Sequence, residues 1–217
     1  MNILVDLRMS LPYVRDQGLN QGLQTACLAF ATSDAHTHSR GDSALLSAGY
    51  LYSRARTRIP QPKLMESTGL TLDAVSKTLE LDGQPLEDDY PSTTVEDKSF
   101  ALPSSTQLFK KPVDVGPHQL DNVFKFIESG RPTILCLDIC RSFYSPEKET
   151  HLIQGTAGQP IISHAVLGVG IGELNEDRYL LVRNSWGARW GDTGHAWVAA
   201  TYLKVRLWQL AVIGLSS

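Results

Sequence analysis

Cysteines are scarce in this chain, which has only Cys27, Cys136 and Cys140 among its 217 residues. So few thiols at such uneven spacing exclude a disulfide framework of the kind that holds small secreted domains together. Long hydrophobic runs are also lacking, because no stretch approaches the roughly 20 apolar residues that a membrane-spanning helix needs. No basic segment followed by an apolar one opens the sequence, so no signal peptide is visible. We expect a globular protein without a membrane partner.

An excess of charge of one sign is missing as well. Lys and Arg number 20 against 23 Asp and Glu, which gives a formal net charge of -3 at pH 7. No stripe of Lys and Arg follows a helix, so the sequence lacks the electrostatic signature of nucleic-acid binding. Hydrophobic residues make up 42% and charged residues 20%, which is the composition of an ordinary globular protein. This composition excludes nucleic acid from the expected partners.

Helical periodicity dominates the first half of the chain. Residues 4–18 should be extended, because Pro12 opposes a helix. From 84 to 117 the chain is rich in Pro, Ser, Thr and Asp, and we expect long surface connections between two halves. Helices are predicted over about 25–39, which Gly41 closes, 43–56 and 70–81.

Strand patterns dominate the second half. One further helix is predicted over 120–129, where Gly130 and Pro132 stop it. After it come runs rich in β-branched residues that are separated by Gly, Asn and Asp turns. Strands are predicted over 133–140, 161–171, 179–184, 194–199 and 206–213.

Cys27 carries the main chemical hypothesis. It lies where the first predicted helix starts, after a run with two Gln-Gly steps that is poor in helix formers. Unpaired N–H groups and the positive end of the helix dipole favour a thiolate at such a position. A lone cysteine on a helix is more often a packing residue, so a nucleophile needs partners elsewhere in the chain.

Two later residues complete a Cys/His/Asn set. His164 begins an apolar strand 137 residues after Cys27 (164 − 27), and Asn184 lies at a strand-to-turn junction 157 residues after it (184 − 27). In papain and cathepsins the histidine and asparagine follow the cysteine by roughly 130–150 residues. The spacing therefore favours nucleophilic catalysis by a thiol.

Several motifs in this order give the chain a resemblance to papain-like cysteine peptidases. They are Val14-Arg-Asp-Gln-Gly18, Cys27-Leu-Ala-Phe-Ala31, Glu87-Asp-Asp-Tyr-Pro91, His164-Ala-Val-Leu-Gly168, and Asn184-Ser-Trp-Gly187 with Trp190-Gly191. The resemblance implies an α+β fold with one catalytic domain over 1–217. A helical lobe over about 15–110 would carry the nucleophile, packed on an antiparallel, barrel-like β-rich lobe over 111–217.

The resemblance also implies a role for each residue of the set. Cys27 would attack as a thiolate, and His164 would share the ion pair and then protonate the leaving amine. Asn184 would orient the histidine ring, and Trp186 would shield their hydrogen bond from water. The expected substrate is a protein or peptide, with no cofactor and no metal, and the expected substrate contacts are Ala165 and Gly69.

The chain departs from the family near the nucleophile. Leu28 follows Cys27 where the family usually has tryptophan, and Gln24 replaces a cysteine that normally forms a disulfide. This resembles the disulfide-free bacterial branch. No inhibitory propeptide is visible, so we expect either an excised domain or a toxin or effector that a dedicated protein inhibitor controls. The expected location of the protein is the cytoplasm or a target cell into which it is delivered.

Other readings of the same residues stay open. The triad could serve deamidation or transglutamination, or the fold could be a catalytically silent binding module.

His36 and His38 point to different helix faces, which suits solvent better than a metal. We expect no set of metal ligands among the remaining histidines, His118, His151 and His195, or from the pair Cys136 and Cys140. The glycine-rich run Gly168-Val-Gly170-Ile-Gly172 fits a closely packed strand better than a nucleotide-binding loop.

The sequence leaves two glutamines as donors to the oxyanion of the tetrahedral intermediate, beside the backbone N–H of Cys27. Gln21 lies six residues before the nucleophile (27 − 21) and Gln17 ten residues before it (27 − 17), and six is the family's spacing. We therefore expect Gln21→Ala to lower kcat by about 10²–10³ and Gln17→Ala to leave it nearly unchanged. Steady-state kinetics of both variants decide the assignment, and a larger loss for Gln17→Ala would reverse it.

Overall fold

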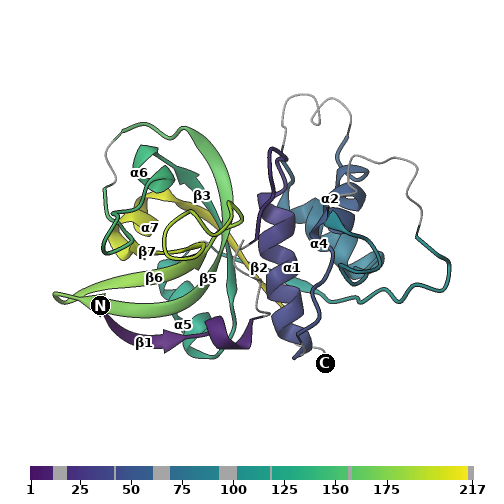
Figure 1. Cartoon of the computed structure of the whole chain (residues 1–217), viewed down its shortest axis with the longest axis horizontal. Helices are drawn as coiled ribbons and strands as arrows, with labels where there is room; N and C mark the ends of the chain where they lie inside the picture. The colour runs from purple at the N-terminus through teal and green to yellow at the C-terminus, as the bar shows by residue number, and fades with distance from the viewer. Residues whose placement is uncertain are drawn as a thin grey trace.

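The structure is a computed structural model that describes residues 1–11, 19–41, 43–60, 69–92, 102–117, 119–155 and 158–214. Helices α1 (Cys27–Arg40), α2 (Ala48–Arg56) and α4 (Leu72–Leu81) gather on one side, and a β-sheet fills the other side (Figure 1). Within the described ranges, no helix has the length and apolar character needed to cross a membrane. The architecture is the α+β arrangement that the sequence predicts.

Helix α1 is the most deeply buried helix of its side. It starts at Cys27 and ends where Gly41 takes the left-handed conformation (φ 73°). Every residue from Leu28 to Thr37 is buried, because α1 packs against the sheet as well as against α2 and α4. Both limits lie within two residues of the predicted ones.

The other two helices begin at side-chain caps. Ser47 accepts a hydrogen bond from the backbone N–H of Tyr50 (3.0 Å), so α2 begins at Ala48 and the predicted start at Ser43 is too early. Thr71 accepts one from Ala74 at the start of α4. A cap of this kind satisfies N–H groups that have no partner inside the helix.

A buried polar network joins α1 to the chain beyond α4. The Gln84 side chain donates to the carbonyl oxygen of Ser47 (2.7 Å) and to the Ser33 hydroxyl. Its oxygen lies 3.1 Å from Nδ1 of His36, which must be the donor because an amide oxygen only accepts. Both His36 and Gln84 are fully buried. The expectation that His36 faces solvent is therefore wrong.

The sheet follows the order β2-β8-β3-β5-β6-β7-β4, and β1 pairs with the second half of β5. All neighbouring pairs are antiparallel except β4 and β7. In the described residues the order runs from one end to the other without closing into a barrel. The strands are β1 (Asn2–Asp6), β2 (Val113–Gly116), β3 (Thr133–Ile139), β4 (Leu152–Ile153), β5 (Ile162–Leu174), β6 (Asp177–Arg183), β7 (His195–Ala199) and β8 (Leu207–Ile213).

The five predicted strands correspond to β3, β5, β6, β7 and β8, and the predicted helix over 120–129 is α5 (Leu120–Glu128). Sequence patterns did not indicate β4 or the short helices α6 (Arg141–Tyr144) and α7 (Ala200–Arg206). The surface connection expected over 84–117 is wrong at both ends, because Gln84 is buried and β2 joins the sheet.

The amino-terminal part of the chain is extended as expected up to Asp6, at the end of β1, and differs from the prediction after it. Residues of β1 pair with β5, and a short 3-10 helix, Arg8–Ser10, follows. The remainder of the predicted segment, including Gln17, lies outside the described residues, as does His118.

Both faces of the sheet are covered, and β3 shows how. Ile134 and Cys136 pack in the cluster that includes α1, α2 and α4. Leu135 and Leu137, which alternate with them, pack in a second cluster with α5 and α7. Since side chains of a strand point to opposite faces in turn, a strand between two cores must be apolar throughout. This explains the continuous hydrophobic run that predicts β3.

The His36 network predicts a loss of stability in acid. Burial lowers the pKa of His36 from its ordinary 6.5 to about 4. Because the folded pKa lies below the unfolded one, the unfolded state takes up the proton first, and the unfolding free energy falls by roughly 3 kcal/mol as pH drops from 6.5 to 4. We expect the unfolding free energy of His36→Asn, measured by urea denaturation, to depend less on pH across this window. An equal slope in both proteins would contradict the assignment.

Candidate active site

Three segments of the chain meet at the start of α1. Cys27 is the first residue of this helix, and His164 and Ala165 lie on β5, opposite Leu137 and Cys136 of β3. The backbone N–H groups of Ala165 and of the first helical residues face the Cys27 sulfur and act to lower the pKa of the thiol. The position predicted for the nucleophile thus places its sulfur beside the strand that carries His164.

His164 and Asn184 are hydrogen bonded to each other. Nε2 of His164 lies 2.8 Å from Oδ1 of Asn184, and both residues are buried. An amide oxygen only accepts, so Nε2 carries the proton and Nδ1 of a neutral ring is free to accept one. The same oxygen accepts from the backbone N–H of Ser185 (2.8 Å), which fixes the amide.

Aromatic side chains surround this hydrogen bond. The rings of Trp186 and His164 have centroids 4.5 Å apart and are tilted by 31°. Phe143, which is fully buried, meets both rings edge-on at 5.9 and 6.0 Å. A positive charge on the imidazole would lie within cation–π distance of the indole.

Gln21 is anchored to the same loop. Its backbone N–H donates to the carbonyl oxygen of Ser185 (2.9 Å), and its side-chain oxygen accepts from the Ser185 hydroxyl (2.6 Å). The side-chain nitrogen donates to the carbonyl oxygen of Gln24 (2.5 Å). Gln17 belongs to the undescribed residues, so the choice between the two glutamines stays a prediction.

A cleft of about 480 Å³ opens between the helices and the sheet, and the predicted site residues line it. Cys27, His164 and Gln21 contribute to its wall together with Ala165 and Gly69. A Cβ added at Gly69 would contact nothing, so its backbone is open to the cleft. The structure therefore brings both expected substrate contacts to the cleft, while Asn184 lies behind His164.

The cleft is also lined by residues that sequence reasoning did not place there, among them Cys136, Tyr144 and Trp208. Cys136 belongs to β3, where burial raises the pKa of its thiol to about 12. Tyr144 and Trp208 are partly exposed aromatic residues. Their aromatic character was the available signal in the sequence, but their relation to Cys27 depends on the fold.

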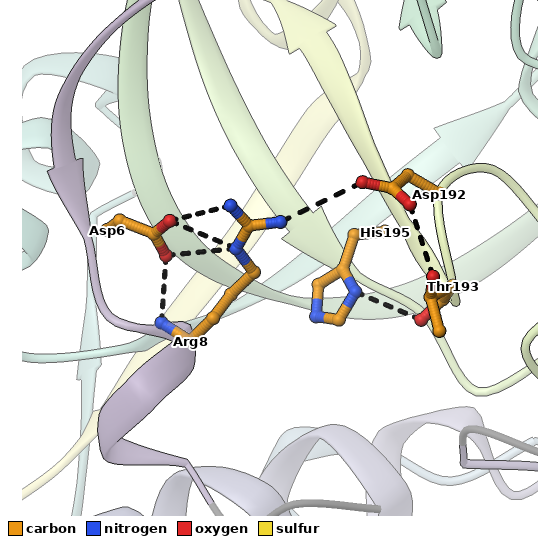
Figure 2. Close-up of polar contacts among 5 residues, drawn as sticks. All are labelled: Asp6, Arg8, Asp192, Thr193 and His195. Carbon is orange, nitrogen blue, oxygen red and sulfur yellow. Dashed lines mark hydrogen bonds and ion pairs between the residues drawn. The ribbon is translucent and has the colours of Figure 1, made fainter. Parts of the chain in front are cut away.

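A tight turn that contains Gly191 and Gly194 supports the loop after Asn184. The backbone N–H of Asn184 donates to the carbonyl oxygen of Gly194 (2.9 Å). Gly191 has a φ of +59°, and a Cβ there would overlap the carbonyl oxygen of His195, so only glycine fits. Figure 2 shows the His195 ring beside this turn, with Nδ1 donating to the carbonyl oxygen of Thr193 (3.1 Å).

An ion-pair cluster ties this turn to the amino-terminal strand (Figure 2). Arg8 lies 2.7 Å from Asp6 and 3.9 Å from Asp192. Burial, with the nearby charges of Arg183 and Arg8, lowers the pKa of His195 to about 4. In the described part of the chain, no three His, Cys, Asp or Glu side chains converge as metal ligands would.

A buried ion pair lies between α1 and the end of β6. Nε of Arg183 is 3.0 Å from a carboxylate oxygen of Asp34, and the two side chains are 8% and 3% exposed. Arg183 immediately precedes Asn184, and Asp34 is on the helix that starts at Cys27. The pair therefore links the helix of the thiol to the strand that delivers the asparagine.

Burial acts against both charges of the expected ion pair. It raises the pKa of Cys27, more than the backbone N–H groups lower it, and it lowers the pKa of His164 to about 4 despite the hydrogen bond to Asn184. The backbone N–H groups at the helix start therefore do not outweigh burial at this thiol. A thiolate here depends on the neighbouring imidazolium, since each charge offsets the cost of burying the other.

Comparison with known proteins gives matches over most of the chain. A family model described as "Papain family cysteine protease" matches residues 10–209. Pro-cathepsin H of Mus musculus is 24% identical over 183 residues, covering 81% of this chain and 54% of its own length. Oryzain gamma chain of Oryza sativa subsp. japonica is 26% identical over 182 residues, covering 81% and 49%. This chain spans about half the length of both relatives.

Solved structures are similar over almost the whole chain. Digestive procathepsin L 3 from the larval midgut of Tenebrio molitor superposes with a TM-score of 0.78 at 20% identity, covering 97% of this chain and 69% of that one. Xylellain, a cysteine protease from Xylella fastidiosa, gives 0.71 at 19% identity, covering 98% and 86%. At these identities the likeness demonstrates the shared fold.

The pKa of His164 predicts the acid limit of thiol reactivity. With a pKa of about 4, the His164 ring is neutral at pH 7 and binds a second proton only near pH 4, where Nδ1 can no longer accept the proton of a thiol. We expect alkylation of Cys27 by iodoacetamide to be steady from pH 7 to about 5 and to fall through pH 4. Peptide mass spectrometry follows the modified site, and circular dichroism confirms folding at each pH. A fall centred at 6.5 would contradict the depressed pKa.

Proposed function

Because this chain belongs to the papain family of cysteine proteases, we propose that it hydrolyses peptide bonds through a thioester formed on Cys27. The observation that carries this proposal is the hydrogen bond between Nε2 of His164 and Oδ1 of Asn184, made by a histidine that lines the same cleft as Cys27. It leaves Nδ1 as the only ring nitrogen that can exchange a proton with the reacting atoms. Proton transfer by a positioned histidine is what thiol-mediated peptide cleavage requires.

In the first half of the reaction, the sulfur of Cys27 bonds to the scissile carbonyl carbon, and the proton of the pair is on Nδ1 of His164. The carbonyl oxygen becomes negative and accepts hydrogen bonds from the backbone N–H of Cys27 and from the Gln21 amide. Collapse of this intermediate breaks the C–N bond. The leaving nitrogen takes the proton from Nδ1, and the acyl group stays on sulfur as a thioester.

In the second half, water replaces the leaving fragment beside His164. Nδ1 removes a proton as the water oxygen bonds to the thioester carbon, and the C–S bond then breaks. The sulfur leaves with the proton returned by His164, and a carboxylic acid is released. Asn184 keeps the ring in one tautomer throughout, so the nitrogen that receives each proton faces the cleft.

The proposed site draws on residues from both halves of the chain. We propose a single catalytic domain over 1–217, with a helical lobe over about 15–110 and a β-rich lobe over 111–217. The helix start of α1 supplies the nucleophile, and β5 with the loop after β6 supplies the base and its orienting amide. A substrate lying in the cleft would contact both halves at Gly69 and Ala165.

A function as a toxin or effector under a dedicated inhibitor remains a further prediction of the sequence, and it concerns delivery and control of the same chemistry. Deamidation or transglutamination uses the same thioester and differs in the group that is released or accepted. Cleavage is favoured here because a cleft of about 480 Å³ has room for residues on both sides of a scissile bond.

The proposal predicts cleavage of an unfolded protein under reducing conditions. Wild-type protein should release peptides from reduced casein, and Cys27→Ala should lower the rate by at least about 10³ because no thioester forms. Intact-mass and peptide mass spectrometry would locate the cut bonds.

Two controls make this result decisive. Cys136→Ala removes a second thiol that lines the same cleft, so retained cleavage by this variant assigns the chemistry to Cys27. A mass gain of about one unit without cleavage would indicate deamidation and contradict the proposal. Absence of any product, together with no alkylation of Cys27 in folded protein, would indicate a silent module.

A further inference from the structure

A second cavity lies at the end of α1 that is far from Cys27. It has a volume of about 280 Å³, and α1 contributes Ala35, His38 and Ser39 to its wall. His38 follows Cys27 by 11 residues (38 − 27), which is about 16 Å along a helix that rises 1.5 Å per residue. Among the described residues, the two linings share no member, so this distal cavity is separate from the catalytic cleft.

Three basic side chains from three segments line the distal cavity. His38 comes from α1, Lys111 precedes β2, and Arg131 lies between α5 and β3. No carboxylate is present among the described residues that line it. The whole chain has a net charge of -3, so this concentration of positive charge is local and does not follow from the composition.

The hydrogen bonds of His38 require a positive charge on its ring. Nδ1 lies 3.2 Å from the carbonyl oxygen of Ser10, and Nε2 lies 3.0 Å from that of Gly130. A carbonyl oxygen only accepts, so both nitrogens must donate when both bonds are present, and only the imidazolium has two N–H groups. The helix dipole also favours a cation in this last turn of α1. Lys111 and Arg131 have no such explanation.

Arg131 keeps donors for a ligand. Its Nη2 donates to the carbonyl oxygen of Ile213 (3.0 Å) and lies 3.6 Å from a carboxylate oxygen of Asp114. Within the described part of the chain, the N–H groups of Nε and Nη1 are left over, since a guanidinium has five N–H groups. The Asp114 side chain is 65% exposed, and an ion pair that exposed contributes little. A bound anion would therefore displace little at Arg131.

The charge of Lys111 acts on the same part of α1. Burial is the main cause of the low pKa of His36, and the charges of Arg40 and Lys111 lower that pKa further. An effect of this kind requires the ammonium group to lie near the helix, because exposed charges are screened over about 10 Å. An anion in the distal cavity would thus meet the charges of both Lys111 and Arg131.

The remaining wall of the distal cavity is apolar. Ala35, Pro132 and Ile213 contribute buried side chains to it. A volume of about 280 Å³ is slightly below the usual range for small-molecule sites, so a ligand would be short. An apolar wall beside cations suits an organic anion better than an inorganic one, because a hydrocarbon body gains free energy when it leaves water.

We propose that the distal cavity binds a small organic anion, whose carboxylate or phosphate group meets Lys111 and Arg131. Its hydrocarbon body would pack against the apolar wall, and the bound molecule would join the last turns of α1 to the turn before β3. This site lies outside the peptidase chemistry, so the inference does not depend on the proposed function.

Backbone amide shifts in NMR spectra locate such binding directly. We would titrate ¹⁵N-labelled protein at constant pH and ionic strength with hexanoate, hexyl phosphate, inorganic phosphate and hexanol. We expect at least one of the two organic anions to shift the signals of Ala35, Gly130 and Gly214 to saturation, and the tighter of the two identifies the anionic group. Inorganic phosphate and hexanol should bind about tenfold more weakly or less, because each lacks one of the two contacts.

Two variants test the role of the charge. Lys111→Gln should weaken binding of the tighter organic anion about tenfold, because a charge-assisted contact is lost. Lys204→Gln makes the same change at an exposed lysine of α7 that does not line the distal cavity, and it should leave the affinity unchanged. Unchanged amide signals elsewhere would show that both variants are folded.

Three results would overturn the proposal. One is the absence of saturable shifts with either organic anion up to about 10 mM, a concentration that still detects very weak sites. Another is equal affinity of Lys111→Gln and the wild type. The third is a set of shifts confined to residues around Cys27 and His164, which would place the anion in the catalytic cleft. None of these results bears on peptide cleavage, so this inference and the proposed function can fail separately.

Discussion

The packing of α1 against the sheet is the constraint on which the site depends. The thiol belongs to one side of the molecule and the imidazole to the other, so their separation is set by how firmly the helix is held. The Asp34–Arg183 pair contributes inside this interface, where both side chains are almost completely buried. Removing one partner of such a pair costs roughly 3–5 kcal/mol, because the other charge stays buried without compensation. The ion pair that helps to hold the helix on the sheet therefore also places two charges in the core, where the loss of either one would be destabilising.

Exclusion of water has opposing effects at this site. The aromatic rings around His164 strengthen its hydrogen bond to Asn184, since electrostatic interactions are stronger where the dielectric constant is low. The same burial disfavours each charge of the thiolate–imidazolium pair when it is considered alone. Three interactions can offset the cost of burying these charges. They are the attraction between the two charges, the backbone N–H groups at the helix start and the face of Trp186. Chemistry in this cleft therefore depends on charges that arise together.

Local patterns predicted the parts of the fold that carry strong periodicity or clear stop signals. Gly41 and Gly130 mark helix ends, and the apolar runs of β3 and β5 reflect burial on both faces. Patterns did not reveal α6, which has four residues, or the buried partner of His36, which is 48 residues away in sequence. Tyr144 was missed for the same reason, because its relation to Trp186 exists only after folding. Motif spacing located Cys27, His164 and Asn184, whose roles remain predictions.

The place of β8 in the sheet has a consequence for how the protein is made. This strand is the last of the described elements, yet it lies between β2 and β3. During synthesis on the ribosome, the position between β2 and β3 stays unfilled until residues 207–213 have emerged, although Cys27 emerges far earlier. The hydrophobic cluster that packs α1 against the sheet includes Ala211 and Ile213 of β8. The surroundings of the helix that begins at Cys27 are therefore completed only when nearly all of the described residues have been made.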